Sequence, residues 1–216
     1  ASSVLGSLFP GIFGSWFFFQ YFCNMILPIV AYGHPVLRKL ATDIKADYPQ
    51  LDKFIEDMWE TMYASSGVGL AAPQVNRDIR LFVVDTEQMF AGMNEEEQKE
   101  YPDAPGLKSV FINAHIVELD GEEWSYNEGC LSIPKVREDI YRHETVTLEY
   151  LDADFNPHTS TFSGLTARVI LHEYDHIEGK LFIDHISPLK RKLMKGKLND
   201  ITKGKINVDY KMMFPG

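Results

Sequence analysis

Apolar and polar positions repeat with two different periods along the chain, and each period predicts its own kind of element. Between Asp47 and Ser65, apolar side chains recur every three or four residues, as on one face of an α-helix. Other segments show the apolar runs or the strict alternation of β-strands, at residues 81–84, 110–113, 116–119, 122–126 and 145–151. The segments 110–113 and 116–119 form either a pair of strands or one long bent strand. The sequence therefore predicts an α+β fold.

Residues 167–179 predict a helix of a different kind, because the apolar side chains in and before this stretch cover more than one face. A helix that is apolar most of the way round is buried. Ser163 is placed to cap its start, and Gly179 lies where such a helix would end. We expect antiparallel or mixed sheets to pack around this central helix, between the N-terminal amphipathic helix and a C-terminal helix.

The C-terminal helix is expected at residues 188–201. Its inward face would hold Leu189, Leu193, Leu198 and Ile201. Its other face carries cations, namely Lys190, Arg191, Lys192, Lys195 and Lys197. A solvated helix face and a docking surface for an acidic partner such as the ribosome both remain open.

Residues 1–24 contain no charged residue and are rich in Phe, Leu, Ile and Trp. The stretch has no basic region before its apolar core, as a secretory signal would, and it is short and broken for a membrane span. We interpret it as an apolar leader or an artificial extension, with membrane association as the lesser alternative. Such a tail could also lie in a groove of a neighbouring molecule and so produce an oligomer.

Composition then narrows the class of protein. We expect one catalytic domain over residues 25–216, with an acidic surface insertion at residues 87–106. The formal net charge of −10 argues against a DNA-binding protein, which needs excess Lys and Arg. The two cysteines, Cys23 and Cys130, indicate no disulfide framework, so we expect a cytoplasmic protein.

The buried helix also carries the candidate chemistry. His172 and His176 lie one helical turn apart on the same face, a spacing that lets two imidazoles bind one metal ion. Glu173 can reach a water on that metal and act as a general base. A buried helix with these polar groups needs a compensating partner, and a bound cation is the simplest one.

A catalytic metal of this kind usually has a third protein ligand. In one common extension of this motif, the third ligand is a histidine downstream of the second, and that position is Phe182 here. In another, the third ligand is a downstream glutamate, but no glutamate follows Glu178. The third ligand is therefore expected upstream. Cys130 is the main candidate, because a thiolate is a strong ligand for iron or zinc. Two alternatives are His185 as the ligand and Cys130 as a covalent nucleophile. A metalloendopeptidase and a non-catalytic, ribosome-associated metal-binding module also remain open.

Three segments, in this order, resemble the signature motifs of the peptide deformylase family: Gly67–Gln74, Glu128–Ser132 and His172–His176. The resemblance implies a hydrolase that removes the formyl group from the N-terminal formyl-methionine of newly made bacterial or organellar proteins and releases formate. It implies one divalent metal ion, usually iron(II), for which zinc, nickel or cobalt can substitute.

The resemblance also assigns roles to individual residues. It makes Cys130, His172 and His176 the metal ligands, and Glu173 the general base and acid that serves a metal-bound hydroxide. Gln74 and the backbone amide of Leu131 would stabilise the developing oxyanion. Gly69 would line the cleft and pair with the substrate backbone, Arg142 would hold Glu128 in place, and Arg137 would face the peptide.

A formyl group is small, so selectivity needs a narrow site beside the metal and an apolar pocket for methionine. The candidates for that pocket are Val68, Tyr126, Ile133, Val169 and the ring edge of His172.

Overall fold

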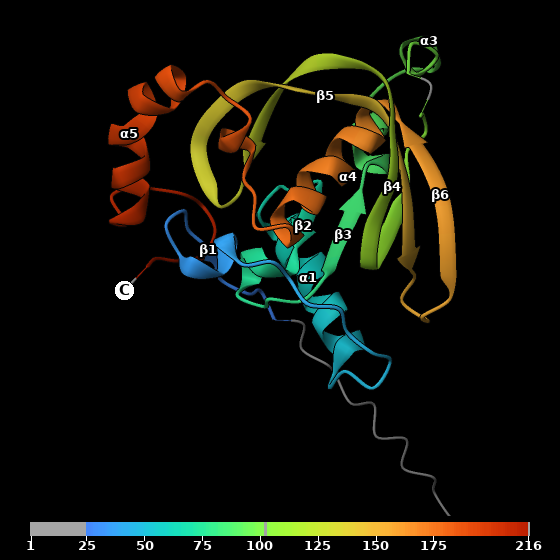
Figure 1. Ribbon diagram of the computed structural model, residues 1–216, viewed down its shortest axis with the longest axis horizontal. Helices are drawn as coiled ribbons and strands as arrows, with labels where there is room; N and C mark the ends of the chain where they lie inside the picture. The colour runs from blue at the N-terminus through green and yellow to red at the C-terminus, as the bar shows by residue number, and fades with distance from the viewer. Residues whose placement is uncertain (1–24, 102, 216) are drawn as a thin grey trace, which may run out of the picture.

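The computed structural model describes residues 25–101 and 103–215, and Figure 1 shows how its elements are arranged. The apolar segment 1–24 and the oligomer expected from it lie outside these residues. The helices are α1 (Leu51–Ala64), α2 (Glu87–Phe90), α3 (Glu95–Gln98), α4 (Gly164–Ile177) and α5 (Pro188–Thr202), with short 3-10 turns at Pro35–Arg38, Ala72–Val75 and Phe182–Asp184. The strands are β1 (Ile29–Val30), β2 (Gly69–Ala71), β3 (Leu81–Asp85), β4 (Lys108–Cys130), β5 (Ile133–Leu151), β6 (Pro157–Ser163) and β7 (Met212–Met213).

Five strands form one antiparallel sheet in the order β2-β3-β4-β5-β6, and β1 pairs in parallel with β7. The segments expected at residues 110–113, 116–119 and 122–126 belong to one long strand, β4, and not to a strand pair. This strand pairs with β5 along most of its length. Register shifts such as those between Ile112 and His115 and between Asp120 and Glu123 interrupt the ladder, and such bulges bend a strand. The hairpin therefore curves over the molecule in Figure 1.

Helix α4 lies in the middle of the molecule and contacts β2, β3, β5 and β6 (Figure 1). Twelve of its fourteen residues are buried, although several of them are charged or are histidines. The predicted α+β fold with antiparallel and parallel pairing is confirmed. None of the helices in the described part of the chain combines the length and the hydropathy of a membrane span.

The start of α4 is held by Asp103, in the segment 87–106. Ser163 occupies the expected N-cap position, but its side chain makes no capping hydrogen bond. Instead, the Thr166 N–H donates to Asp103 Oδ2 at 2.7 Å. Gly164 has a φ of +58°, and a Cβ there would lie 2.3 Å from Asp103 Oδ1, so a larger residue would collide with the cap. The helix ends before Gly179, which has a φ of +70° as expected for this position.

Two expected helices differ in detail from the structure. Helix α1 begins at Leu51 and not near Asp47, because Gln50 adopts a left-handed conformation (φ 55°) that a helix cannot include. In α5, the prediction that Leu189 and Leu193 point inward is wrong, since they are 68% and 78% exposed. Only the C-terminal half of α5 reaches the core, where Leu198 and Ile201 are buried.

Replacing Asp103 with Ala should destabilise the protein, because the Thr166 N–H loses its acceptor at the start of the buried helix. A lost N-cap costs about 1 kcal/mol, equivalent to a fall of about 3 °C in the melting temperature for a chain of this size. Thermal denaturation followed by circular dichroism measures the fall.

Asp103→Asn keeps an acceptor oxygen and should recover most of the stability. Asn94→Ala removes the cap of the short, exposed helix α3 and serves as the matched control, with little expected change. A melting temperature for Asp103→Ala equal to that of the control would refute the capping role.

Candidate metal and active site

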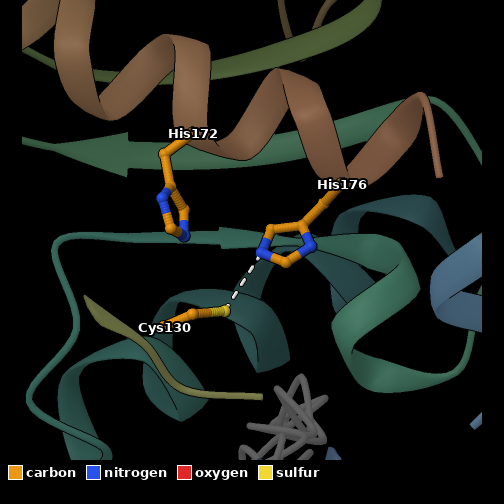
Figure 2. Close-up of side chains that lie close together, drawn as sticks. All are labelled: Cys130, His172 and His176. Atoms are coloured by element: carbon orange, nitrogen blue, oxygen red, sulfur yellow. Dashed lines mark hydrogen bonds between the residues drawn. The ribbon is translucent and has the colours of Figure 1, made fainter. Parts of the chain in front are cut away.

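Helix α4 and the tip of the β4–β5 hairpin bring three metal-binding side chains together. His172 and His176 project from α4 toward Cys130, which ends β4 (Figure 2). Cys130 Sγ lies 3.2 Å from His176 Nε2, and one ligand atom from each of the three residues lies within 4.8 Å of the others. Cys130 pairs with Ile133 across a tight turn, so the hairpin tip fixes the position of the thiol.

The three donors fit one metal ion. A thiolate with two imidazole nitrogens suits zinc, iron and related transition metals. His176 is buried, and its Nδ1 has no hydrogen-bond partner among the described residues. His172 Nδ1 donates to Glu128 Oε2 at 2.9 Å, which leaves the Nε2 lone pair of that ring for a metal.

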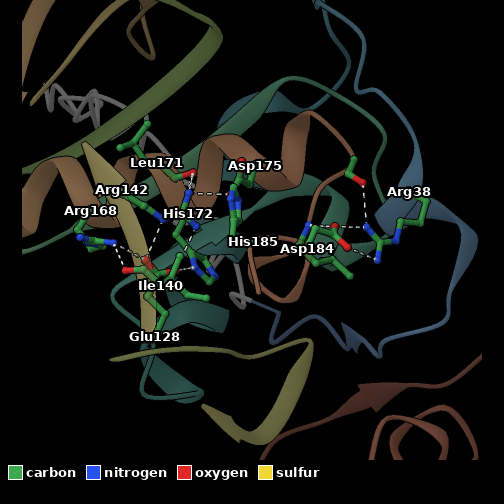
Figure 3. Close-up of polar contacts among 12 residues, drawn as sticks. Arg38, Glu128, Ile140, Arg142, Arg168, Leu171, His172, Asp175, Asp184 and His185 are labelled. Atoms are coloured by element: carbon green, nitrogen blue, oxygen red, sulfur yellow. Dashed lines mark hydrogen bonds and ion pairs between the residues drawn. The ribbon is translucent and has the colours of Figure 1, made fainter. Parts of the chain in front are cut away.

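Glu128 is the centre of a buried ion-pair network that orients His172 (Figure 3). It accepts hydrogen bonds from Arg142 Nε at 2.8 Å and Nη2 at 3.1 Å, and from Arg168 Nη1 at 3.2 Å. Burial raises the pKa of Glu128, but the hydrogen bonds from His172 and Arg142 and their charges outweigh it and hold the pKa well below its usual range. Glu128 is therefore a fixed negative charge behind the His172 ring.

Arg142 links Glu128 to a second carboxylate, Asp175, to which its Nη1 donates at 2.7 Å. His185 Nε2 also contacts Asp175 Oδ2, at 2.7 Å. Burial raises the pKa of Asp175, but His185 and Arg142 together lower it to about 2. His185, which the sequence left open as a metal ligand, thus bonds to a carboxylate and lies outside the group of three donors.

The acid–base properties of the site differ sharply between Cys130 and Glu173. Burial raises the pKa of Cys130, but His176 and His172 outweigh it and lower the pKa to about 5, so the group is a thiolate at neutral pH. Burial raises the pKa of Glu173 to about 7, against the opposing charges of the two histidines. Glu173 can therefore both accept and donate a proton near neutral pH.

Glu173 points at the edge strand of the sheet. A Cβ on Gly69 in β2 would lie 2.6 Å from Glu173 Oε1, so only glycine leaves room for the carboxylate there. Glu173 Oε2 is buried and has no hydrogen-bond partner among the described residues. This oxygen is free to bond to a water or a substrate group.

Gln74 is fully buried beside the donors. Its Oε1 accepts from the Ala71 N–H at 2.7 Å, and its Nε2 lies 3.5 Å from Cys130 Sγ. The first contact fixes which end of the amide is the donor end, so the amide nitrogen faces Cys130.

Comparison with known proteins identifies the family. The family described as polypeptide deformylase matches residues 26–192. The chain belongs to this family. It is 56% identical over 191 residues to a peptide deformylase of Christiangramia forsetii, covering 88% of this chain and 97% of that protein. A peptide deformylase of Flavobacterium johnsoniae is 58% identical over 190 residues, covering 88% and 96%.

Solved deformylase structures agree with this assignment. The crystal structure of a peptide deformylase from Legionella pneumophila superposes with a TM-score of 0.69 at 36% identity, covering 84% of this chain and 98% of that one. A Plasmodium falciparum peptide deformylase in complex with an inhibitor gives 0.67 at 30% identity, covering 82% and 99%. The resemblance inferred from the three motifs is confirmed.

The three deformylase motifs border one cavity of about 810 Å³. Of the residues expected to form a methionine pocket, four line it: Val68, Tyr126, Val169 and His172. Ile133 instead is fully buried in the core cluster that includes Cys130, so we expect it to support the hairpin and not to touch a peptide. Arg137 also lines the cavity, and its Nε donates to Asn127 Oδ1 at 2.8 Å.

The sequence reasoning missed other residues at the site. Arg168 donates to Glu128 and stacks over Trp124 at 4.3 Å. Its position one helical turn before His172 was a signal that could have found it. Met89 in α2 and the segment 207–210 also line the cavity, and nothing in their local sequence indicates this.

Replacing Glu128 with Gln should reduce stability in a pH-dependent way. The depressed pKa means that the carboxylate stabilises the fold fully above its ordinary pKa of 4.5, and that this contribution is lost as the pH falls below that value. At pH 7 the free energy of unfolding should fall by about 3 kcal/mol, the usual cost of breaking a buried ion pair. Urea denaturation with a chelator present, repeated from pH 7 to pH 3, measures it.

The difference between the Glu128→Gln variant and the original protein should narrow as the pH falls. Glu122→Gln, at an exposed position of the same strand, should show no comparable effect. A difference that stays constant with pH would contradict the charge-based role of Glu128.

Proposed function

We propose that this protein is a metal-dependent hydrolase that removes the formyl group from the N-terminal formyl-methionine of newly made proteins and releases formate. The observation that carries the proposal is the buried Cys130, His172 and His176 group, beside Glu173 in one cavity of a deformylase-family chain. The proposal places the enzyme in the cytoplasm, where formylated chains begin.

Cys130, His172 and His176 would hold one divalent ion, and we take iron(II) to be the physiological metal, with zinc, nickel or cobalt as substitutes. When bound, such an ion polarises a carbonyl oxygen and makes water acidic. Glu128 and Arg142 act through His172: they fix its ring orientation and keep its Nδ1 protonated, so that Nε2 remains the donor atom.

Glu173 handles the proton. Its pKa of about 7 allows the carboxylate to take a proton from the attacking water and to pass it to the leaving amine of the methionine. The unpartnered Oε2 atom is available for this contact. The reaction breaks the formyl carbon–nitrogen bond and leaves formate and a peptide with a free amine.

Negative charge develops on the formyl oxygen as water attacks. We assign its stabilisation to Gln74 Nε2, whose orientation is fixed by the bond between Oε1 and the Ala71 N–H, and to the backbone amide of Leu131. One such donor lowers the barrier by about 3 kcal/mol in comparable acyl-transfer sites. A buried amide side chain in an otherwise apolar segment is consistent with this role.

The peptide would enter along β2, which is the edge strand of the five-stranded sheet. An edge strand offers free backbone groups to an extended peptide, so Gly69 can pair with the substrate backbone. Val68 and Val169 would contact the methionine side chain, and Arg137 would face the following residues.

The ribosome is a reasonable partner, because nascent chains emerge from it, and the exposed surface of α5 supports this proposal. Its exposed Leu189 and Leu193 lie among cations, of which Lys192, Lys195 and Lys197 have no ion-pair partner among the described residues.

Replacing Glu173 with Gln should abolish turnover without removing the metal. General acid–base catalysis contributes about 10²- to 10⁴-fold, so formate release from formyl-Met-Ala should fall by at least about 100-fold. Formate is measured anaerobically with a coupled dehydrogenase, and metal content by mass spectrometry. Glu149→Gln, at an exposed strand position, is the matched control.

Undiminished formate release by Glu173→Gln would refute its assigned role. Cleavage of internal peptide bonds, with none of formyl-Met peptides, would identify a metalloendopeptidase instead.

Removing the metal should stop the reaction, and so should removing its sulfur ligand. A chelator should abolish formate release, and iron(II) should restore it. Cys130→Ala should bind much less metal at equal concentration, because the two histidines alone make a weaker site. Full activity with the chelator present would favour Cys130 as a covalent nucleophile. Full metal occupancy in Cys130→Ala would show that the ligand assignment is wrong.

A further inference from the structure

The turn that follows Cys130 is held by two residues that flank the two-stranded sheet of β1 and β7. The Tyr210 hydroxyl donates to the carbonyl oxygen of Leu131 at 2.8 Å. The Tyr32 N–H donates to the carbonyl oxygen of the next residue, Ser132, also at 2.8 Å. Two consecutive carbonyls of the turn are therefore fixed by residues far away in the sequence.

Tyr210 is itself held firmly in place. Directly after it, the Lys211 carbonyl accepts from the Ile29 N–H and the Met213 carbonyl accepts from the Ala31 N–H, each at 2.8 Å. The Tyr210 ring is half-buried and packs with Leu131 at the edge of a core cluster. Its hydroxyl is thus delivered to the turn by a backbone that pairs with β1.

This contact comes from a part of the chain that the family match does not reach. The match ends at residue 192, whereas residues 207–210 line the same cavity as Gly69 and Glu173. The C-terminal segment therefore forms one wall of the site and also bonds to the backbone of a residue within the Glu128–Ser132 motif.

We propose that Tyr210 is a positioning residue that orients the backbone amide of Leu131 toward the reacting formyl oxygen. The inference rests on the proposed deformylase chemistry. The Leu131 N–H precedes its carbonyl by two rotatable backbone bonds, and Cys130 fixes the peptide on its other side. Holding the Leu131 carbonyl therefore restricts the remaining rotation of the N–H, and Leu131 lines the cavity.

Such a role affects turnover more than binding. The oxyanion exists only as the reaction proceeds, so a misdirected donor lowers kcat and changes KM little. A residue that merely stabilised the fold would change neither parameter in the folded enzyme. A lower kcat with an unchanged KM therefore distinguishes a positioning residue from one that only stabilises the fold.

The test compares Tyr210→Phe with Tyr48→Phe in the full-length, iron-loaded enzyme. Both variants lose one hydroxyl from a ring at the edge of the same core cluster, but the Tyr48 hydroxyl has no hydrogen-bond partner among the described residues. Tyr210→Phe should lower kcat for formyl-Met-Ala by about three- to tenfold, the equivalent of one neutral hydrogen bond. KM and metal content should stay close to those of Tyr48→Phe.

A second measurement does not depend on turnover. In the zinc-loaded protein, amide hydrogen exchange followed by NMR should be faster at Leu131 in Tyr210→Phe than in Tyr48→Phe, because the turn is held less firmly. Equal exchange rates and equal kcat in the two variants would overturn the proposal. Loss of metal in Tyr210→Phe would also overturn it, since the residue would then act on Cys130.

The two measurements keep this inference separate from the function. If the unmodified protein releases no formate, the proposed function fails, while the exchange rate at Leu131 still decides whether Tyr210 fixes the amide. If the unmodified protein is active and Tyr210→Phe matches the control in both measurements, only the inference fails.

Discussion

Burying a helix that carries His172, Glu173 and His176 costs free energy unless each polar group meets a partner. The hairpin of β4 and β5 supplies partners for the two histidines, because the last residues of β4 place Glu128 against His172 and Cys130 against His176. The tip of the hairpin and α4 thus meet at this contact, and both border the cavity. A bound cation would complete the compensation, since three donors converge there.

Burial raises the pKa of both carboxylates of the site, but the groups around them give opposite net shifts. Glu128 meets Arg142, Arg168 and His172, so it stays ionised and keeps a low pKa. Glu173 accepts no hydrogen bond from a cationic side chain of the described residues, and burial raises its pKa to about 7. One carboxylate therefore serves as a fixed charge, whereas the other can exchange a proton. Sequence spacing alone does not distinguish these two roles, because the difference depends on which side chains fold around each group.

Local patterns predicted the elements well, and tertiary contacts were harder to foresee. The apolar periodicity of α4 and the spacing of its histidines lie within one helical turn, so they could be recognised from the sequence, and the search for a third donor led to Cys130. The cap from Asp103 and the bond from Tyr210 join residues 63 and 79 positions apart, and no local pattern encodes such contacts. Amphipathicity in α5 located a helix but not the half of it that the core covers, which is why Leu189 was misplaced.

The central claim is that one metal ion joins the hairpin to the helix through Cys130, His172 and His176. X-ray absorption at the metal edge of the anaerobically prepared, iron-loaded protein tests this most directly, because sulfur and nitrogen neighbours scatter differently. The account predicts one sulfur and two imidazole nitrogens around the metal, and loss of the sulfur signal in Cys130→Ala. A spectrum of the unmodified protein with no sulfur neighbour would contradict it.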